Sequence, residues 1–399
     1  MRENEVYQIY DDFVMNTYSR SRVVFIKGKG SRLWDIHHKE YIDLFPGWGV
    51  SVLGHCPSEV MNAIRHQVSK LIHLSNNFYH IPQARLAREI VYRMGFPAKV
   101  FFCNSGAESV EGALKLARAW GKEKGRYEII TMENSFHGRT LGSLTLTGQD
   151  VYQKGFDPLL PGVRRVKFND ISAVEKVISD KTAAVILELI QGEGGINVAD
   201  KDYVKKLRAL CDEKGVLLII DEVQTGMGRT GAWFCFQNYD IIPDIITLAK
   251  GLGGGVPIGA TVAKKEVADA FKPGMHASTF GGGPLVCRAG VAVFKAIQKH
   301  RLITRVKRLG EELGKRLNSW KDRWPERVVD VRGMGFMWGV ELSIPCKEIV
   351  ERAMDRGVLV NCTHQRVLRI MPALNVEEKY LEKGLSILEE VLDETFSQS

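Results

Sequence analysis

From about residue 95 to residue 290, short apolar runs alternate with amphipathic stretches. Between the runs, DYVKKLRALCDEKG reads as a helix, and its Gly215 is a typical helix stop. Strands that alternate with helices predict an α/β fold with a mostly parallel sheet, covered on both faces. Ligands bind such sheets at the carboxyl ends of the strands. The expected strands are VFFCN (100–104), EIITM (128–132), AAVILEL (183–189), VLLIID (216–221) and IITLA (245–249).

The two ends of the chain have a different pattern. Residues 20–45 resemble a small antiparallel meander with a Gly-rich turn. After about residue 290, helices precede the apolar segments VVDVRGMGFMWGVEL, VLVN and VLRIMPAL, which predict a smaller α+β domain. We therefore expect a large domain over 46–288 and a small domain over 289–399. The N-terminal segment, 1–45, is expected to pack with the small domain.

Composition narrows the class of protein. The chain has 399 residues, of which 45% are hydrophobic and 26% charged, as in ordinary globular proteins. It has no apolar run of about 18 residues and no secretory signal, so we expect a cytoplasmic protein without membrane spans. The net charge of +8 is spread along the chain without a binding module for nucleic acid, so we expect no such partner.

The seven cysteines carry no metal or disulfide signature. They are scattered, with no C-x-x-C pair, and no H-E-x-x-H motif is present. The sequence therefore predicts buried, reduced thiols and no metal site.

Two residues at strand ends carry candidate chemistry. Asp221 ends the apolar run VLLII, where an ionised carboxylate needs a cationic or hydrogen-bonding partner. Lys250 follows IITLA and precedes four glycines among five residues, which allow a sharply bent backbone in a confined cleft. A lysine amine in such a cleft can lose its proton near neutral pH and attack an aldehyde to form a Schiff base.

Two further motifs lie at strand ends. NSGAES (104–109) joins the strand VFFCN to a helix, and its small residues let backbone N–H groups approach an anion at the helix N-terminus. It is a candidate phosphate cradle. Phe136 and His137, in SFHGRT, follow the strand EIITM, where an aromatic side chain can stack on a flat ring.

Taken together, these motifs resemble the class III aminotransferases of the fold-type I pyridoxal-phosphate enzymes over nearly the whole chain. DEVQTGMGRTG followed by LAKGLGGGVPIGA is the most specific part of the resemblance. FFCNSGAES, SFHGRT, LELIQGEGG and STFGGGP are most similar to the acetylornithine and ornithine branch of that family.

The resemblance implies pyridoxal 5'-phosphate as the cofactor. Lys250 would hold it covalently, and Asp221 would pair with its pyridine nitrogen, which makes the ring an electron sink. Thr279 would complete the phosphate site from the neighbouring subunit, so a homodimer is expected. The other expected cofactor-binding residues are Ser105, Gly106, Ala107, Phe136, His137, Val223 and Gln224.

The resemblance also implies two substrates that use one site in turn. Arg139 would grip a substrate carboxylate. Arg369 would bind a second carboxylate, and Glu193 would cover Arg369 while an ω-amine is bound. Tyr18 would also line the substrate pocket. Trp48 would reshape it, because it stands where acetylornithine enzymes usually carry a small aliphatic residue and ornithine enzymes a tyrosine.

The expected reaction moves the ω-amino group of N-acetylornithine, or of a close relative, to 2-oxoglutarate in arginine biosynthesis. Another ω-aminotransferase or an aminomutase remains an alternative. Candidate donors are ornithine, succinylornithine, 4-aminobutyrate or a carrier-linked lysine precursor. A nicotinamide-dependent dehydrogenase is disfavoured because neither RGMGFMWG nor GLGGG forms the G-x-G-x-x-G loop. A cofactor-binding regulator would need an appended DNA-binding domain, for which the chain has no spare length.

Overall fold

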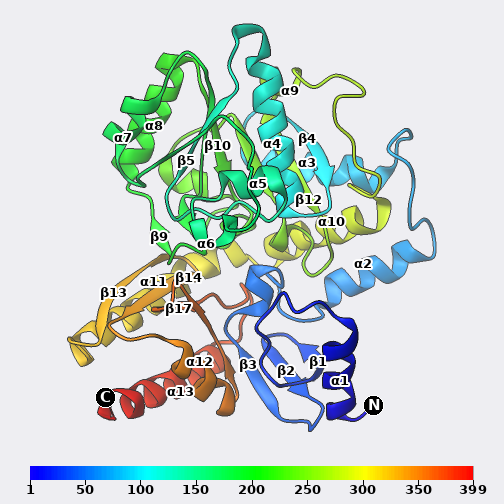
Figure 1. Ribbon diagram of the computed structural model, residues 1–399. Coiled ribbons are helices and arrows are strands. Elements are labelled where there is room, and N and C mark those ends of the chain that lie inside the picture. Colours follow the sequence, from blue (N-terminus) through cyan, green and yellow to red (C-terminus); the bar gives the residue numbers. More distant parts are fainter. Residues whose placement is uncertain (399) are drawn as a thin grey trace.

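A seven-stranded sheet forms the centre of the larger part of the molecule (Figure 1). The computed structural model describes residues 1–398. All neighbouring strands are parallel except β12 (Gly259–Lys264), which is antiparallel to both β11 (Ile245–Leu248) and β4 (Ala98–Cys103). The predicted mostly parallel sheet is thus confirmed, although β6 and β12 were not predicted. In spatial order the strands are β4 (Ala98–Cys103), β12 (Gly259–Lys264), β11 (Ile245–Leu248), β10 (Leu217–Asp221), β7 (Thr182–Leu187), β5 (Glu128–Met132) and β6 (Val163–Val166).

Both faces of the central strands are buried, which explains why β7, β10 and β11 are almost continuously apolar. In β10, Leu217 and Ile219 belong to the apolar cluster formed with α4 (Gly106–Gly121). Leu218 and Ile220 belong to the larger cluster that includes side chains of α3 (Ile81–Met94), α8 (Lys201–Lys214) and α10 (Pro284–Lys299). Because successive strand residues point to opposite faces, a sheet covered on both sides needs an apolar residue at every position.

Helices surround the sheet (Figure 1). Helix α8 ends as predicted at Gly215, which adopts the left-handed conformation (φ 58°). No helix within residues 1–398 is both long and apolar enough to cross a membrane. In the large part the helices are α2 (Ser58–Val68), α3 (Ile81–Met94), α4, α5 (Leu141–Leu146), α6 (Asp150–Gln153), α7 (Ile171–Val177), α8 (Lys201–Lys214), α9 (Lys265–Ala268) and α10 (Pro284–Lys299).

The two ends of the chain lie side by side below the large sheet (Figure 1). After α1 (Glu3–Phe13), the meander β1 (Phe25–Lys29), β2 (Arg32–Asp35) and β3 (Glu40–Asp43) is antiparallel, as predicted. Strand β15 (Val358–Leu359), from the C-terminal region, extends this sheet parallel to β3. The N-terminal strands and the C-terminal region therefore share backbone hydrogen bonds.

The C-terminal region builds a second antiparallel sheet, in the order β13, β14, β17, β16. It supplies the predicted smaller α+β part, packed against the large part through one continuous apolar cluster. A short hairpin, β8 (Ile190–Gln191) and β9 (Asn197–Val198), lies in the large part. The C-terminal elements are α11 (Leu302–Arg323), β13 (Val328–Met334), β14 (Met337–Leu342), α12 (Lys347–Asp355), β16 (Asn361–Thr363), β17 (Val367–Ile370) and α13 (Glu378–Ser397).

The prediction that all cysteines are buried thiols was wrong for three of them. Cys346 and Cys362 form a disulfide that joins the start of α12 to β16. The two residues are 16 positions apart in sequence, and only the packing of α12 beside β16 brings them together. Cys56 is a free thiol but is exposed. The prediction holds for the buried free thiols Cys103, Cys211, Cys235 and Cys287.

Candidate active site

Five predicted site segments meet in one cavity at the carboxyl ends of the parallel strands. Asp221 ends β10, Lys250 follows β11, and His137 lies in the loop after β5. The cavity measures about 510 Å³, within the usual range for small-molecule sites. Its lining includes Ser105, Gly106, Ala107, Phe136, His137, Arg139, Glu188, Glu193, Asp221, Val223, Gln224 and Lys250.

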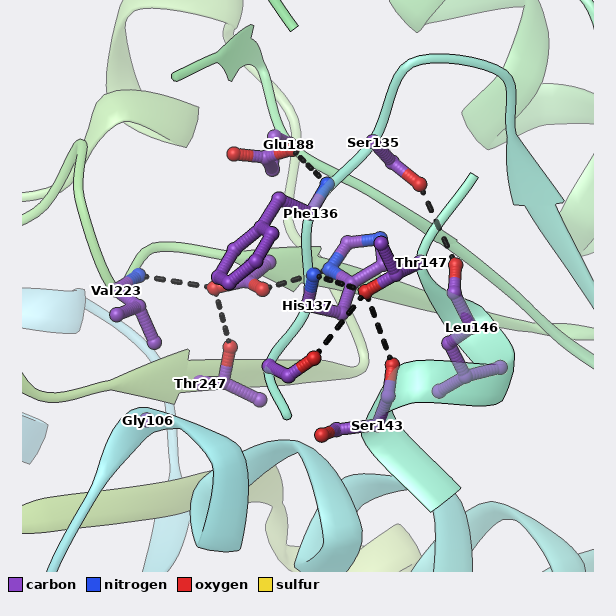
Figure 2. Close-up of polar contacts among 12 residues, drawn as sticks. Gly106, Ser135, Phe136, His137, Ser143, Leu146, Thr147, Glu188, Val223 and Thr247 are labelled. Carbon is purple, nitrogen blue, oxygen red and sulfur yellow. Dashed lines mark hydrogen bonds and ion pairs between the residues drawn. The ribbon is translucent and has the colours of Figure 1, made fainter. Parts of the chain in front are cut away.

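The carboxylate of Asp221 lines this cavity, is buried, and has three polar partners within the protein. Its Oδ2 lies 2.7 Å from Nδ1 of His137. Its Oδ1 accepts hydrogen bonds from the backbone N–H of Val223 at 3.0 Å and from Oγ1 of Thr247 at 2.9 Å (Figure 2). These bonds supply the partners that a buried carboxylate requires. These partners fix the orientation of the side chain in the cavity lining.

The amine of Lys250 lies in an environment that favours its neutral form. Burial lowers its pKa below the usual value, and the positive charge of Arg369 adds to this effect, whereas the charge of Glu193 opposes it. The backbone of Lys250 has φ 45°, in the left-handed region that side chains other than glycine rarely adopt. Strain of this kind is typical of functional positions whose surroundings hold them in place.

The segment between β4 and α4 has the form of an anion cradle. Ser105 is the N-cap of α4, and its Oγ accepts a hydrogen bond from the backbone N–H of Glu108 at 3.2 Å. A Cβ at Gly106 would lie 2.8 Å from Cγ1 of Val223, so this position needs glycine. The cradle therefore combines a helix N-terminus with a backbone that a ligand can approach closely, which fits a phosphate group.

Glu193 and Arg369 form an ion pair beside Lys250. Oε1 of Glu193 lies 2.8 Å from Nη1 of Arg369, and the Arg369 side chain is fully buried. Burial alone would raise the pKa of Glu193, but the charge and hydrogen bond of Arg369 outweigh it and hold this pKa below its usual value. Nη1 of Arg369 also donates to Oε1 of Gln224 at 3.2 Å. A Cβ at Gly192 would lie 2.0 Å from that same oxygen, so a larger residue at this position would displace the Gln224 amide from Arg369.

Arg139 lies at the exposed side of the cavity. Its guanidinium carbon is 4.1 Å from the ring centroid of Tyr152 and 5.6 Å from that of Phe136. These cation–π contacts orient the guanidinium without occupying its hydrogen-bond donors. The donors therefore remain available to an anionic group in the cavity.

Glu188 is a cavity residue that sequence reasoning missed. It follows β7, and its carboxylate accepts hydrogen bonds from the backbone N–H groups of Phe136 at 2.9 Å (Figure 2) and Gly192 at 3.1 Å. Burial and the nearby charge of Asp221 raise its pKa to about 7, against the opposing charge of His137. A carboxylate at the tip of an apolar strand was the signal that identified Asp221, and it applies equally here.

Four predicted site residues are not part of the cavity lining. Arg369 is fully buried and reaches the cavity through its contacts with Glu193 and Gln224. The other three are exposed. Thr279 is exposed, in the long loop before α10. Tyr18 is 61% exposed and lines a separate hollow formed by the N-terminal segment. Trp48 is 49% exposed, with its ring 6.4 Å from that of Phe45. The roles of these three residues stay predictions.

The chain is similar in sequence and in structure to known aminotransferases. The model of the family described as aminotransferase class-III matches residues 14–392. The acetylornithine aminotransferase of Aquifex aeolicus is 47% identical over 383 residues, covering 95% of this chain and 100% of that protein. The crystal structure of an ornithine aminotransferase from Toxoplasma gondii superposes with a TM-score of 0.94 at 32% identity, covering 100% of this chain and 96% of that one.

An N-acetylornithine aminotransferase from Stenotrophomonas maltophilia gives a TM-score of 0.85 at 33% identity, covering 98% of this chain and 100% of that one. The likeness to these enzymes thus extends over the whole fold, including the N-terminal strands and the small part. By sequence, fold and the residues gathered in its cavity, the chain belongs to the class-III aminotransferase family.

Proposed function

We propose that this protein transfers the ω-amino group of N-acetylornithine, or of a closely related ω-amine, to 2-oxoglutarate as a step of arginine biosynthesis. The observation that carries the proposal is the ion pair between buried Arg369 and Glu193, a residue that lines the same cavity as Lys250. The names of relatives such as the Aquifex aeolicus enzyme support the acetylated donor.

The cavity residues fit pyridoxal 5'-phosphate as the cofactor. Ser105, Gly106 and Ala107 would hold the phosphate at the N-terminus of α4. The Asp221 carboxylate would hold a proton on the ring nitrogen, and Phe136 and Val223 would enclose the ring. When bound at Lys250, the cofactor supplies an electron sink for the substrate carbon that loses a proton.

Lys250 would serve as the proton carrier of the reaction. Its lowered pKa increases the share of the neutral amine, which is the form needed to accept a proton from the substrate carbon. Gln224 would hydrogen-bond the ring hydroxyl while its Oε1 faces Arg369. His137 would act on the cofactor only indirectly, by holding the Asp221 carboxylate in place through Nδ1.

Two substrates of different shape would use the two arginines in turn. The ω-amine would place its α-carboxylate on Arg139 while Glu193 covers Arg369. 2-Oxoglutarate has carboxylates at both ends, and its second carboxylate would displace Glu193 from Arg369. A second copy of the chain would add Thr279 to the phosphate site, so the proposed active species is a homodimer.

A panel of half-reactions tests the proposal. The purified holoenzyme would be mixed with N-acetylornithine, ornithine, succinylornithine or 4-aminobutyrate, and the visible absorbance of the cofactor followed. We expect the largest spectral change per unit time with N-acetylornithine, and recovery of the starting spectrum on adding 2-oxoglutarate. A faster change with another amine would identify that amine as the preferred donor instead. No change with any amine would contradict the aminotransferase reaction itself.

A further inference from the structure

Arg369 is held along one edge by a single neutral oxygen. Oδ1 of Asn361 accepts hydrogen bonds from both Nε, at 3.0 Å, and Nη2, at 2.7 Å. The two residues face each other directly in the pairing of β16 with β17. This register places the carboxamide beside the guanidinium edge that contains Nε, so Nη1 points to Glu193 and Gln224.

The charge of Arg369 is balanced by a single carboxylate of the described chain. Within residues 1–398, Glu193 is the one carboxylate that forms an ion pair with it. The remaining acceptors are neutral: the oxygens of Asn361, Gln224 and the Gly192 backbone. The face of the guanidinium lies over the ring of Phe45, 4.5 Å from its centroid. A fully buried cation in these surroundings keeps a strong requirement for an anion whenever Glu193 moves away.

The same short strand also holds Glu193. Thr363, two residues after Asn361, donates from Oγ1 to the backbone oxygen of Glu193 at 2.8 Å. Between them, Cys362 ties β16 to the start of α12 through the disulfide with Cys346. Strand β16 thus holds both members of the ion pair. Asn361 binds the side chain of Arg369, and Thr363 binds the backbone of Glu193.

We propose that Asn361 is a positioning residue that determines specificity at Arg369. It fixes the guanidinium without neutralising it, so that Glu193 and a substrate carboxylate can alternate on Nη1 and the free donor of Nη2. A carboxylate at position 361 would accept the same two bonds but would satisfy the charge permanently. The inference rests on the proposed function, because it assigns the dicarboxylate half-reaction to Arg369.

The test compares N361D with N361A in the holoenzyme, with N318D as a matched control. Asn318 is an exposed asparagine on α11 whose amide donates to the Gly314 backbone oxygen. Three quantities are measured for each variant: the Kd of glutarate by calorimetry, the Michaelis constant for the keto acid 2-oxoglutarate, and the rate of the half-reaction with N-acetylornithine. The melting temperature reports any loss of folding.

For N361D we expect the glutarate Kd and the Michaelis constant for 2-oxoglutarate to rise at least tenfold, the factor that corresponds to about one charge-assisted hydrogen bond. The donor half-reaction should stay within about twofold, because Glu193 covers Arg369 during that step. For N361A, which removes the acceptor without adding charge, the glutarate Kd should rise less than for N361D. N318D should leave all three quantities unchanged.

A glutarate Kd that rises as much in N361A as in N361D would overturn the inference, since lost packing would then explain the effect. Equal losses in the two half-reactions would also overturn it. If N361D does not fold, N361A decides alone: the inference requires a larger loss with 2-oxoglutarate than with the donor. Failure of the unaltered enzyme to react with any ω-amine would contradict the proposed function. The glutarate Kd of the variants would still test whether Asn361 controls anion binding at Arg369.

Discussion

Nδ1 of His137 lies 2.7 Å from Oδ2 of Asp221, and both side chains are buried. The other ring nitrogen of His137, Nε2, is also buried and has no hydrogen-bond partner among the described residues. Asp221 is therefore the only hydrogen-bond partner of the imidazole ring among the described residues. Asp221 has two further donors, from Val223 and Thr247, so its position does not depend on His137 alone.

Because Asp221 has three polar partners and His137 is only one of them, substitutions of the two residues should lower activity to different extents. Asp221→Ala removes the only carboxylate proposed to meet the cofactor nitrogen and should lower kcat by about a hundredfold or more, while cofactor still binds. His137→Ala leaves Asp221 with two hydrogen bonds and should lower kcat by about tenfold. Steady-state kinetics with cofactor content measured on the same sample checks both. Near-normal turnover of Asp221→Ala would refute its electronic role.

Lys250→Ala should abolish turnover without abolishing cofactor binding, because the phosphate cradle lies on a different segment. Borohydride treatment of the unaltered holoenzyme, followed by mass spectrometry of its peptides, should find the cofactor attached at Lys250 and should remove the visible absorbance. Lys206→Ala, on the exposed surface of α8, serves as the control and should behave like the unaltered protein. Attachment of the cofactor at another lysine would contradict the assignment.

Glu193→Gln should reduce the preference for ω-amines. The substitution keeps the shape of the side chain but removes the charge that is paired with Arg369 at 2.8 Å. Arg369 would then be open to the α-carboxylate of any amino acid. We expect the ratio of half-reaction rates, ω-amine over glutamate, to fall by about tenfold, the equivalent of one charge-assisted hydrogen bond. An unchanged ratio would mean that Glu193 does not cover Arg369 during the donor step.

Loss of the Cys346–Cys362 disulfide should destabilise the small part. The bond closes a loop between residues 16 positions apart, for which the chain-entropy model gives about 3 kcal/mol. Denaturant unfolding of the oxidised protein should therefore show a higher free energy of unfolding than the Cys346→Ser, Cys362→Ser double variant. Cys56→Ser, at an exposed free thiol, is the control. If reduction of the unaltered protein changes nothing, the disulfide contributes no stability.

Glu222 should make stability depend on pH. Burial raises its pKa from 4.5 to about 7, and the charge of Asp221 contributes, although hydrogen bonds from Cys235, Thr225 and Phe236 oppose the shift. The folded protein then holds this proton more tightly than the unfolded chain between pH 4.5 and 7, so this contribution to stability falls as pH rises through that window.

Glu222→Gln cannot lose a proton and should flatten that dependence by up to about 1.4 kcal/mol per pH unit. Unfolding free energies at pH 5, 6 and 7 measure it, with the exposed Glu175→Gln as the control for removal of charge. A slope identical to that of the unaltered protein would show that Glu222 is already ionised at pH 5.

The sequence alone was sufficient to predict the main strands of the large sheet and to place Asp221 and Lys250 at strand ends. A strand covered on both faces must be apolar at every position, so its pattern is visible locally. A charged residue at the end of such a strand is equally visible, as for Asp221 and Lys250. The same signal was present at Glu188 but was not used.

Tertiary structure decided the relationships that depend on long-range pairing. The antiparallel insertion of β12 between β4 and β11, the disulfide at Cys346 and Cys362, and the contact of Asn361 with Arg369 have no local signature. Each follows from which strands become neighbours and in which register, and that outcome is set by burial of the whole apolar surface. Hydrophobic periodicity identifies the face that a segment buries but does not identify the segment that covers it.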